Sequence, residues 1–192
     1  MNRIERIAVN WVLFIIVSLA VLAVPLYMIF RAETVLSKGN LYLFKVEPRD
    51  PYDPFRGRYL DIRVQQNYVE NCKKDFSPGE VCYAVIAKDA KGFAYFSELS
   101  TQPPAAGDYI RVKFRWKNKN KSLIELPFGR YFVNEKIAPE ADKLLAGFFT
   151  DPKDCCVLKV KVKDGQALVS GLNLNGIPIE EVVKRKMTRD SR

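Results

Sequence analysis

The longest uninterrupted apolar stretch of the chain lies near its N-terminal end. From Ile7 to Phe30 no charged residue occurs, and a helix of that length, rising about 1.5 Å per residue, crosses the hydrocarbon layer of a bilayer with some tilt. Trp11 and Tyr27 lie near the two ends of the stretch, where amphipathic rings prefer the membrane interface. The pattern predicts one transmembrane helix over residues 7–30, which stays attached to the chain as an anchor.

A cleaved signal peptide is the alternative interpretation of this stretch. The apolar region of a signal peptide usually has about 7–15 residues and ends in a small-x-small cleavage site. The stretch here is longer, and Ala20 and Ala23 do not have that spacing. A short basic leader with Arg3 and Arg6 is typical of a signal-anchor, and large domains translocate largely regardless of their charge. We therefore expect the N-terminus in the cytoplasm and the following domain on the other side of the membrane.

After the apolar stretch, the pattern changes to short segments in which apolar and polar residues alternate. Such alternation is typical of half-buried β-strands. Asp164-Gly165 between two alternating runs predicts a hairpin, and Pro139 followed by Glu140 predicts one short helix over residues 139–145. The predicted strands cover residues 41–46, 59–65, 81–87, 93–96, 109–116, 122–126, 130–133, 156–162 and 167–170.

The predicted fold is therefore mainly β, a sandwich or small open barrel with one short helix, joined to one N-terminal transmembrane helix. No second domain boundary is visible in the sequence. The expected organisation is an N-terminal tail (1–6), the transmembrane helix (7–30), a polar linker (31–39), a single β-rich domain (40–180) and a basic C-terminal tail (181–192).

Composition narrows the chemistry of this domain. The 192 residues carry a net charge of +9, which suits anionic lipid, nucleic acid or an acidic protein. We expect no nucleic-acid partner, because basic residues interleaved with aromatic ones on a known module are missing. The chain has no histidine, which removes Ser-His-Asp triads, Cys-His dyads and nearly all the usual zinc sites. We also expect no metal and no cofactor.

The four cysteines allow two interpretations. Cys72 and Cys82 flank a turn-like loop, and a disulfide that closes this loop would suit an oxidising compartment. Two reduced, buried thiols are the alternative. Cys155 and Cys156 are adjacent, and neighbours in a strand point to opposite faces, so a bond between them would need a distorted backbone.

A polar loop precedes the strand predicted from residue 59. Three prolines within residues 48–54 exclude a helix and a central strand. The charged residues of the loop form either a recognition surface or a mutually neutralised network that only fixes the loop. The candidate residues are Asp50, Asp53, Arg56, Gly57, Arg58 and Tyr59. A second candidate set, Arg130, Tyr131 and Glu135, allows the same two interpretations.

These two segments resemble the GDYXXLXY family of bacterial membrane-anchored proteins. The first reads Asp50-Pro-Tyr-Asp-Pro-Phe-Arg-Gly-Arg-Tyr-Leu-Asp-Ile62, and the second reads Phe128-Gly-Arg-Tyr-Phe-Val-Asn-Glu135. The Gly-Asp-Tyr of the family name corresponds to Gly57-Arg58-Tyr59 in the first segment, and it occurs literally at Gly107-Asp108-Tyr109. The resemblance covers nearly the whole soluble domain. It implies a small protein of the bacterial inner membrane that accompanies a larger multi-pass membrane protein, and it supplies no catalytic residues.

We therefore expect a non-enzymatic accessory protein with its domain in the periplasm. Asn10 and Ser18, on roughly one face of the apolar helix, are candidates for hydrogen bonds to a partner helix. One alternative is an envelope module that binds a small molecule or a glycan. Another is a membrane peptidase of the Ser-Lys type, which needs a nucleophilic serine beside a desolvated lysine. The serines of the domain lie in polar loops or strands without a recognisable signature of such an enzyme; they are Ser77, Ser97, Ser100, Ser122 and Ser170.

Overall fold

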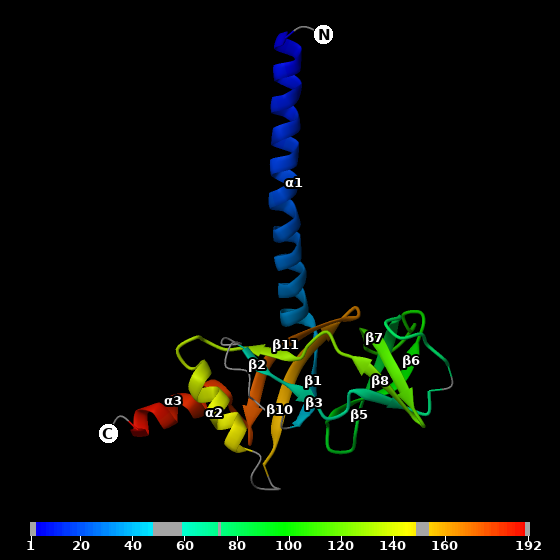
Figure 1. Cartoon of the computed structure of the whole chain (residues 1–192), viewed down its shortest axis with the longest axis vertical. Helices are drawn as coiled ribbons and strands as arrows, with labels where there is room; N and C mark the ends of the chain where they lie inside the picture. The colour runs from blue at the N-terminus through cyan, green and yellow to red at the C-terminus, as the bar shows by residue number, and fades with distance from the viewer. Residues whose placement is uncertain (1–2, 48–58, 73, 149–153, 191–192) are drawn as a thin grey trace.

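The structure is a computed structural model that describes residues 3–47, 59–72, 74–148 and 154–190. A long helix, α1 (Arg3–Lys38), stands on a β-rich domain (Figure 1). Among the described residues, α1 is the one helix long and apolar enough to cross a membrane, and the domain buries none of its apolar part. The structure thus confirms an N-terminal candidate for a membrane-spanning helix on a strand-rich domain.

The end of α1 belongs to the domain. The sequence predicts a polar linker over residues 31–39, and this prediction is wrong because the helix continues to Lys38. Val35 is only 3% exposed, since this part of α1 contacts β10 (Cys156–Lys163) and β11 (Gln166–Leu174). Burial of one valine within a mostly polar stretch holds the last helical turns in place, and a single buried position gives no visible period in the sequence.

A five-stranded antiparallel sheet continues from the helix. Its order is β12 (Ile177–Pro178), β11, β10, β1 (Asn40–Glu47) and β3 (Arg63–Val64). The turn between β10 and β11 has φ of 49° at Asp164 and 77° at Gly165, the left-handed conformation that an Asp-Gly hairpin uses. The hairpin predicted from the sequence is therefore confirmed.

Four longer strands and the short strand β4 close a small barrel. Its order is β4 (Tyr68–Glu70), β6 (Ala94–Ser100), β5 (Val81–Lys88), β7 (Tyr109–Asn118) and β8 (Lys121–Glu125). β4 pairs in parallel with β6 and antiparallel with β8, which closes the ring. The barrel is closed rather than open because of β4, and this strand is too short to show an alternating pattern.

The strand predicted over residues 59–65 is divided between two sheets. β2 (Tyr59–Asp61) pairs with β9 (Arg130–Phe132), whereas β3 pairs with β1. Between them, the N–H of Ile62 donates to the carbonyl of Gly129 at 2.8 Å. Alternation of apolar and polar residues continues through the break, so the sequence pattern alone does not reveal it.

Two helices pack beside β2, β11 and β12. α2 (Ala138–Phe148) confirms the short helix predicted from Pro139. α3 (Ile179–Asp190) occupies most of the segment expected to be a basic tail, and that expectation is wrong. Ile179 and Val183 are both completely buried, and their spacing of four places them on one helix face. In Figure 1 the two helices lie on one side of the central sheet and the barrel on the other.

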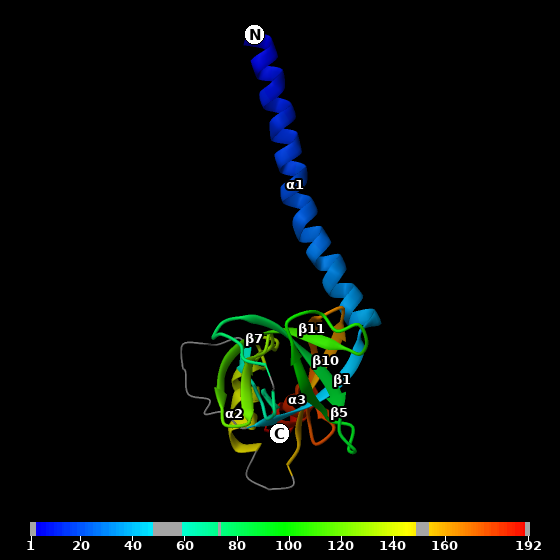
Figure 2. The same ribbon diagram turned by 90° about the vertical axis from the view of Figure 1, so that its right-hand side faces the viewer.

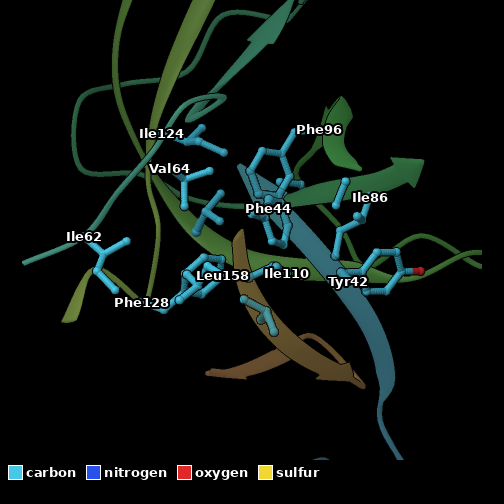
Figure 3. Packing of buried hydrophobic residues seen from close by; sticks show 14 of the residues in the cluster. Tyr42, Phe44, Ile62, Val64, Ile86, Phe96, Ile110, Ile124, Phe128 and Leu158 are labelled. Carbon is cyan, nitrogen blue, oxygen red and sulfur yellow. The ribbon is translucent and has the colours of Figure 1, made fainter. Parts of the chain in front are cut away.

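The sheet and the barrel share one hydrophobic core below α1 (Figure 2). Phe44 of β1 is completely buried at its centre. Its ring stacks on that of Phe96 in β6, with 5.4 Å between the ring centroids, and lies 5.6 Å from that of Phe128 (Figure 3). Because this core is continuous, the sheet and the barrel form a single domain, and the orientation of β1 also sets that of the barrel.

Replacement of Phe44 by alanine tests this shared core. We expect F44A to lose about 3–5 kcal/mol of unfolding free energy, because a buried ring leaves a cavity between the sheet and the barrel. The measurement is urea unfolding of the full chain in detergent, monitored by near-UV circular dichroism. The control is L41A in the same strand, where the side chain is 40% exposed and the expected loss is below about 1 kcal/mol. Equal losses in the two variants would contradict a shared core.

Candidate functional site

Two short strands, β2 and β9, form a separate ribbon at the edge of the domain. Among the described strands they pair only with each other, with Leu60 opposite Tyr131 and Asp61 opposite Arg130. β2 belongs to the first segment that resembles the GDYXXLXY family, and β9 belongs to the second. The two segments are therefore hydrogen-bonded neighbours, and we call this pair of strands the β2–β9 ribbon. β9 contacts β11 of the five-stranded sheet, and Figure 1 shows β2 in the half of the domain toward α1.

The inner face of the ribbon is attached to α3. Leu60 is 1% exposed, and the hydroxyl of Tyr131 donates a hydrogen bond to the carboxylate of Glu180. Burial, together with the hydrogen bond to the Glu180 carboxylate, raises the pKa of Tyr131 above its usual value. The tyrosine therefore stays a neutral donor at any physiological pH, and it holds β9 against the first turn of α3.

The outer face of the ribbon is open to solvent. Arg130 and Phe132 alternate with Tyr131 along β9 and are exposed, Phe132 to 72%. Both line an open cleft of about 660 Å³, whose opposite wall is Leu168 and Val169 of β11. The site thus presents an arginine and a large apolar ring side by side. This pairing is common in protein interfaces.

The structure describes some of the predicted site residues and leaves others outside the described residues. Tyr59 opens β2 and Tyr131 lies at the centre of β9, so the structure places these two candidate residues on paired strands. Glu135 is exposed in the connection between β9 and α2. Asp50, Asp53, Arg56, Gly57 and Arg58 lie outside the described residues, and their role as a recognition loop stays a prediction.

A second polar cluster ties the barrel to the helix end. The carboxylate of Asp108 accepts hydrogen bonds from the side-chain amide of Asn40 at 2.7 Å and from the hydroxyl of Tyr42 at 2.9 Å. Two causes raise the pKa of Tyr42 to about 12: burial is the larger, and the neighbouring Asp108 carboxylate adds to it. The prediction of site residues missed this cluster, although the literal Gly107-Asp108-Tyr109 was a signal that could have revealed it.

The structure holds all four cysteines as free thiols, which is the second of the two interpretations that the sequence left open for Cys72 and Cys82. Cys82 is completely buried in the barrel, whereas Cys72 is half-buried. Burial is the largest cause that raises the pKa of Cys82 to about 11 and that of Cys156 to about 12. Both thiols therefore remain protonated and unreactive at neutral pH.

Two of the serines that a Ser-Lys peptidase would use are placed in structural roles. Ser122 is completely buried in the barrel, and the hydroxyl of Ser170 donates to the backbone carbonyl of Lys159 at 3.2 Å. Neither hydroxyl is hydrogen-bonded to a lysine amine in the structure, so the base that activates such a nucleophile is not supplied to either of them.

Comparison with known proteins gives one match. A family model described as "GDYXXLXY protein" matches residues 21–172. The matched span includes the second half of α1, the β2–β9 ribbon and the Asp108 cluster, and it ends within β11. No curated protein and no solved structure matches the chain.

A double-mutant cycle tests the attachment of the ribbon. We expect Y131F to lose about 1–3 kcal/mol of unfolding free energy, because a carboxylate is left without its donor. In an E180Q background the same substitution should cost clearly less, so the two changes are coupled. The measurement is urea unfolding of the full chain. Additive effects of Y131F and E180Q would show that the hydroxyl and the carboxylate do not interact.

Thiol labelling tests the state of the cysteines. In the native chain at pH 8, iodoacetamide should modify the half-buried Cys72 and Cys155 and spare Cys82 and Cys156, because burial blocks access and favours the protonated thiol. All four should react after unfolding without reductant. If unfolding exposes only two reactive thiols until a reductant is added, a disulfide is present and the free-thiol structure is contradicted. Peptide mapping identifies the modified residues.

Proposed function

The chain belongs to the GDYXXLXY family, and we propose that it is a membrane-anchored, non-enzymatic interaction subunit whose partner is a multi-pass protein of the bacterial inner membrane. The N-terminus lies in the cytoplasm and the domain in the periplasm. The observation that carries this proposal is the β2–β9 ribbon, a separate pair of strands with an exposed aromatic ring.

The anchor supports a partner within the membrane. The apolar part of α1 is not covered by its own domain, so lipid or another helix covers it. A domain held at the membrane meets other membrane proteins at a raised effective concentration. Asn10 and Ser18 add polar groups to a helix that is otherwise apolar at this level, and such groups form hydrogen bonds between membrane helices.

The ribbon supports docking of a protein surface. A two-stranded ribbon is marginally stable by itself in water, and its strands have no other strand partner among the described residues. Phe132 is one of the most exposed large apolar side chains of the domain, and Arg130 lies two residues before it on the same face. Aromatic rings and arginines dominate the binding energy of protein interfaces. The partner therefore covers Phe132 and the adjoining cleft.

Side-chain chemistry favours binding over catalysis. The chain has no histidine, and the described residues hold no group of acids and cysteines suited to a metal ion. Cys82 and Cys156 are buried, with pKa values raised to about 11 and about 12, which makes them poor nucleophiles. The groups that stand out at the ribbon, an arginine and a phenylalanine, are recognition groups.

A binding module for a small molecule or glycan is the second candidate. It is favoured by the cleft beside β9, whose volume of about 660 Å³ lies within the range of about 300–1,000 Å³ typical of ligand sites. Its wide opening to solvent suits the edge of a partner protein better than a small enclosed ligand. If the purified chain has no protein partner, the ligand-binding module becomes the preferred function and the interaction subunit the second candidate.

Affinity purification from native membranes tests the proposal. We expect the tagged full-length chain, expressed at its native level and extracted in mild detergent, to retain a stoichiometric multi-pass membrane protein. F132A should weaken the complex by about 2 kcal/mol or more, roughly thirtyfold, because it removes a central interface ring. Quantitative mass spectrometry of the eluate measures the retained partner.

The matched control is W116A, which removes another exposed aromatic ring, 48% exposed, from β7 of the barrel. It should leave the complex intact. Equal loss in F132A and W116A would contradict docking at the ribbon. A monodisperse chain with no partner would contradict the interaction-subunit role itself, and a search for a ligand of the cleft would then follow.

A further inference from the structure

A crevice of about 390 Å³ lies between α1 and the turn that joins β10 to β11. Its helix wall includes Tyr27, Phe30 and Arg31, and its other wall includes Lys163 and Gln166. Figures 1 and 2 both show this turn, in orange, at the height of the last turns of α1. We propose that the crevice binds one anionic phospholipid, with its phosphate held by the two cations and an acyl chain along the two aromatic rings.

The class of ligand follows from the level of the crevice along the helix. Tyr27 and Phe30 close the uncharged stretch, and Arg31 is the first charge after it. The crevice therefore straddles the level at which hydrocarbon gives way to lipid headgroups. Phospholipids are the molecules that surround a membrane-spanning helix at this level. This step rests on the membrane anchoring contained in the proposed function.

The two cations are available to a phosphate. Arg31 is exposed and forms no ion pair with any described residue. The amine of Lys163 lies 3.1 Å from the carboxylate of Asp164, whose side chain is 79% exposed. An ion pair so open to water contributes little stability, so the amine exchanges it readily for a lipid phosphate. A guanidinium binds phosphate oxygens in a two-pronged geometry, which adds orientation to the charge.

The walls of the crevice are fixed before a lipid arrives. Gly165 lies so close to the ring of Tyr109 that a side chain at this glycine would meet Cε2 at 2.6 Å. The N–H of Arg111 donates to the carbonyl of Gly165 at 3.0 Å, which ties the turn to the barrel. On the helix side, the buried Val35 holds the last turns of α1 against the sheet. Binding to such a preformed site orders few protein groups and therefore costs little entropy.

The charges of the crevice favour anionic over zwitterionic lipid. Arg31 and Lys163 face a single carboxylate, that of Asp164, so the cluster has one excess positive charge. Phosphatidylcholine carries an ammonium group that this cluster repels, whereas phosphatidylglycerol presents a phosphate without one. A basic residue near a membrane surface strengthens binding to anionic lipid about fivefold. We therefore expect a preference of about tenfold from two cations, one of which is partly neutralised.

Native mass spectrometry of the full-length chain tests the proposal. The chain is released from nanodiscs of equimolar phosphatidylcholine and phosphatidylglycerol, and we expect retained phosphatidylglycerol in excess. R31Q/K163Q should lower this excess about tenfold. The matched control K184Q removes an exposed lysine from α3, which Figures 1 and 2 show well below α1, and it should keep the excess. An unchanged excess in R31Q/K163Q would overturn the proposal.

Two further experiments extend the test. A competition experiment distinguishes a lipid phosphate from a soluble phosphate, and a crosslinking experiment uses the unaltered chain and therefore needs no variant. Millimolar glycerol phosphate should not displace the retained lipid, and displacement would assign the site to a soluble phosphate and overturn the lipid proposal. A photoreactive phosphatidylglycerol should crosslink to residues 27–34 and 163–166 of the unaltered chain. Crosslinks spread over the whole domain would overturn the proposal even if R31Q/K163Q failed to fold.

Alkaline carbonate extraction separates this proposal from the proposed function. A chain that resists extraction but retains both lipids equally lacks the lipid site and keeps its anchor. A chain that carbonate releases from the membrane lacks the anchor, on which both proposals depend.

Discussion

At the base of α1, the backbone of Gly39 lies against that of Val162 in β10. A side chain at Gly39 would stand 3.0 Å from the carbonyl oxygen of Val162, and the amine of Lys161 donates to the carbonyl of Gly39 at 3.0 Å. α1 ends at Lys38 and β1 begins at Asn40, so no flexible linker separates the helix from the sheet. This close backbone approach fixes the direction in which the helix leaves the domain.

The remaining features follow from that fixed direction. Asn40 and Tyr42, in the first three residues of β1, donate to Asp108 and so join the barrel to the helix end. The next inward-facing residue of β1, Phe44, packs in the shared core against Phe96 of the barrel. This contact prevents the barrel from moving independently of the sheet. With the helix set across a membrane, the β10–β11 turn lies at the height of the last turns of α1 and faces the bilayer (Figures 1 and 2). The lipid site and the docking surface that we propose both depend on the orientation that this junction gives to the domain.

The sequence predicts the elements with a regular pattern and misses those held by single long-range contacts. Alternation locates the long strands, and Asp164-Gly165 locates the hairpin between β10 and β11. The extension of α1 depends on burial of Val35, and the break at Ile62 depends on one hydrogen bond to Gly129. α3 depends on burial of an apolar pair within a highly charged segment. The two motif segments could be named from the sequence, but only the register of β2 and β9 shows that they are neighbours.

The depth of the β10–β11 turn relative to the membrane tests the fixed junction most directly. Spin labels are attached at D164C or at K184C in a C72S/C155S background, and the full-length chain is reconstituted in liposomes. Power saturation with oxygen and a water-soluble nickel complex then measures the depth of each label. The account predicts the label at residue 164 in the headgroup layer and the label at residue 184 in bulk water. Equal and complete exposure of both labels to water would contradict a rigid junction at Gly39.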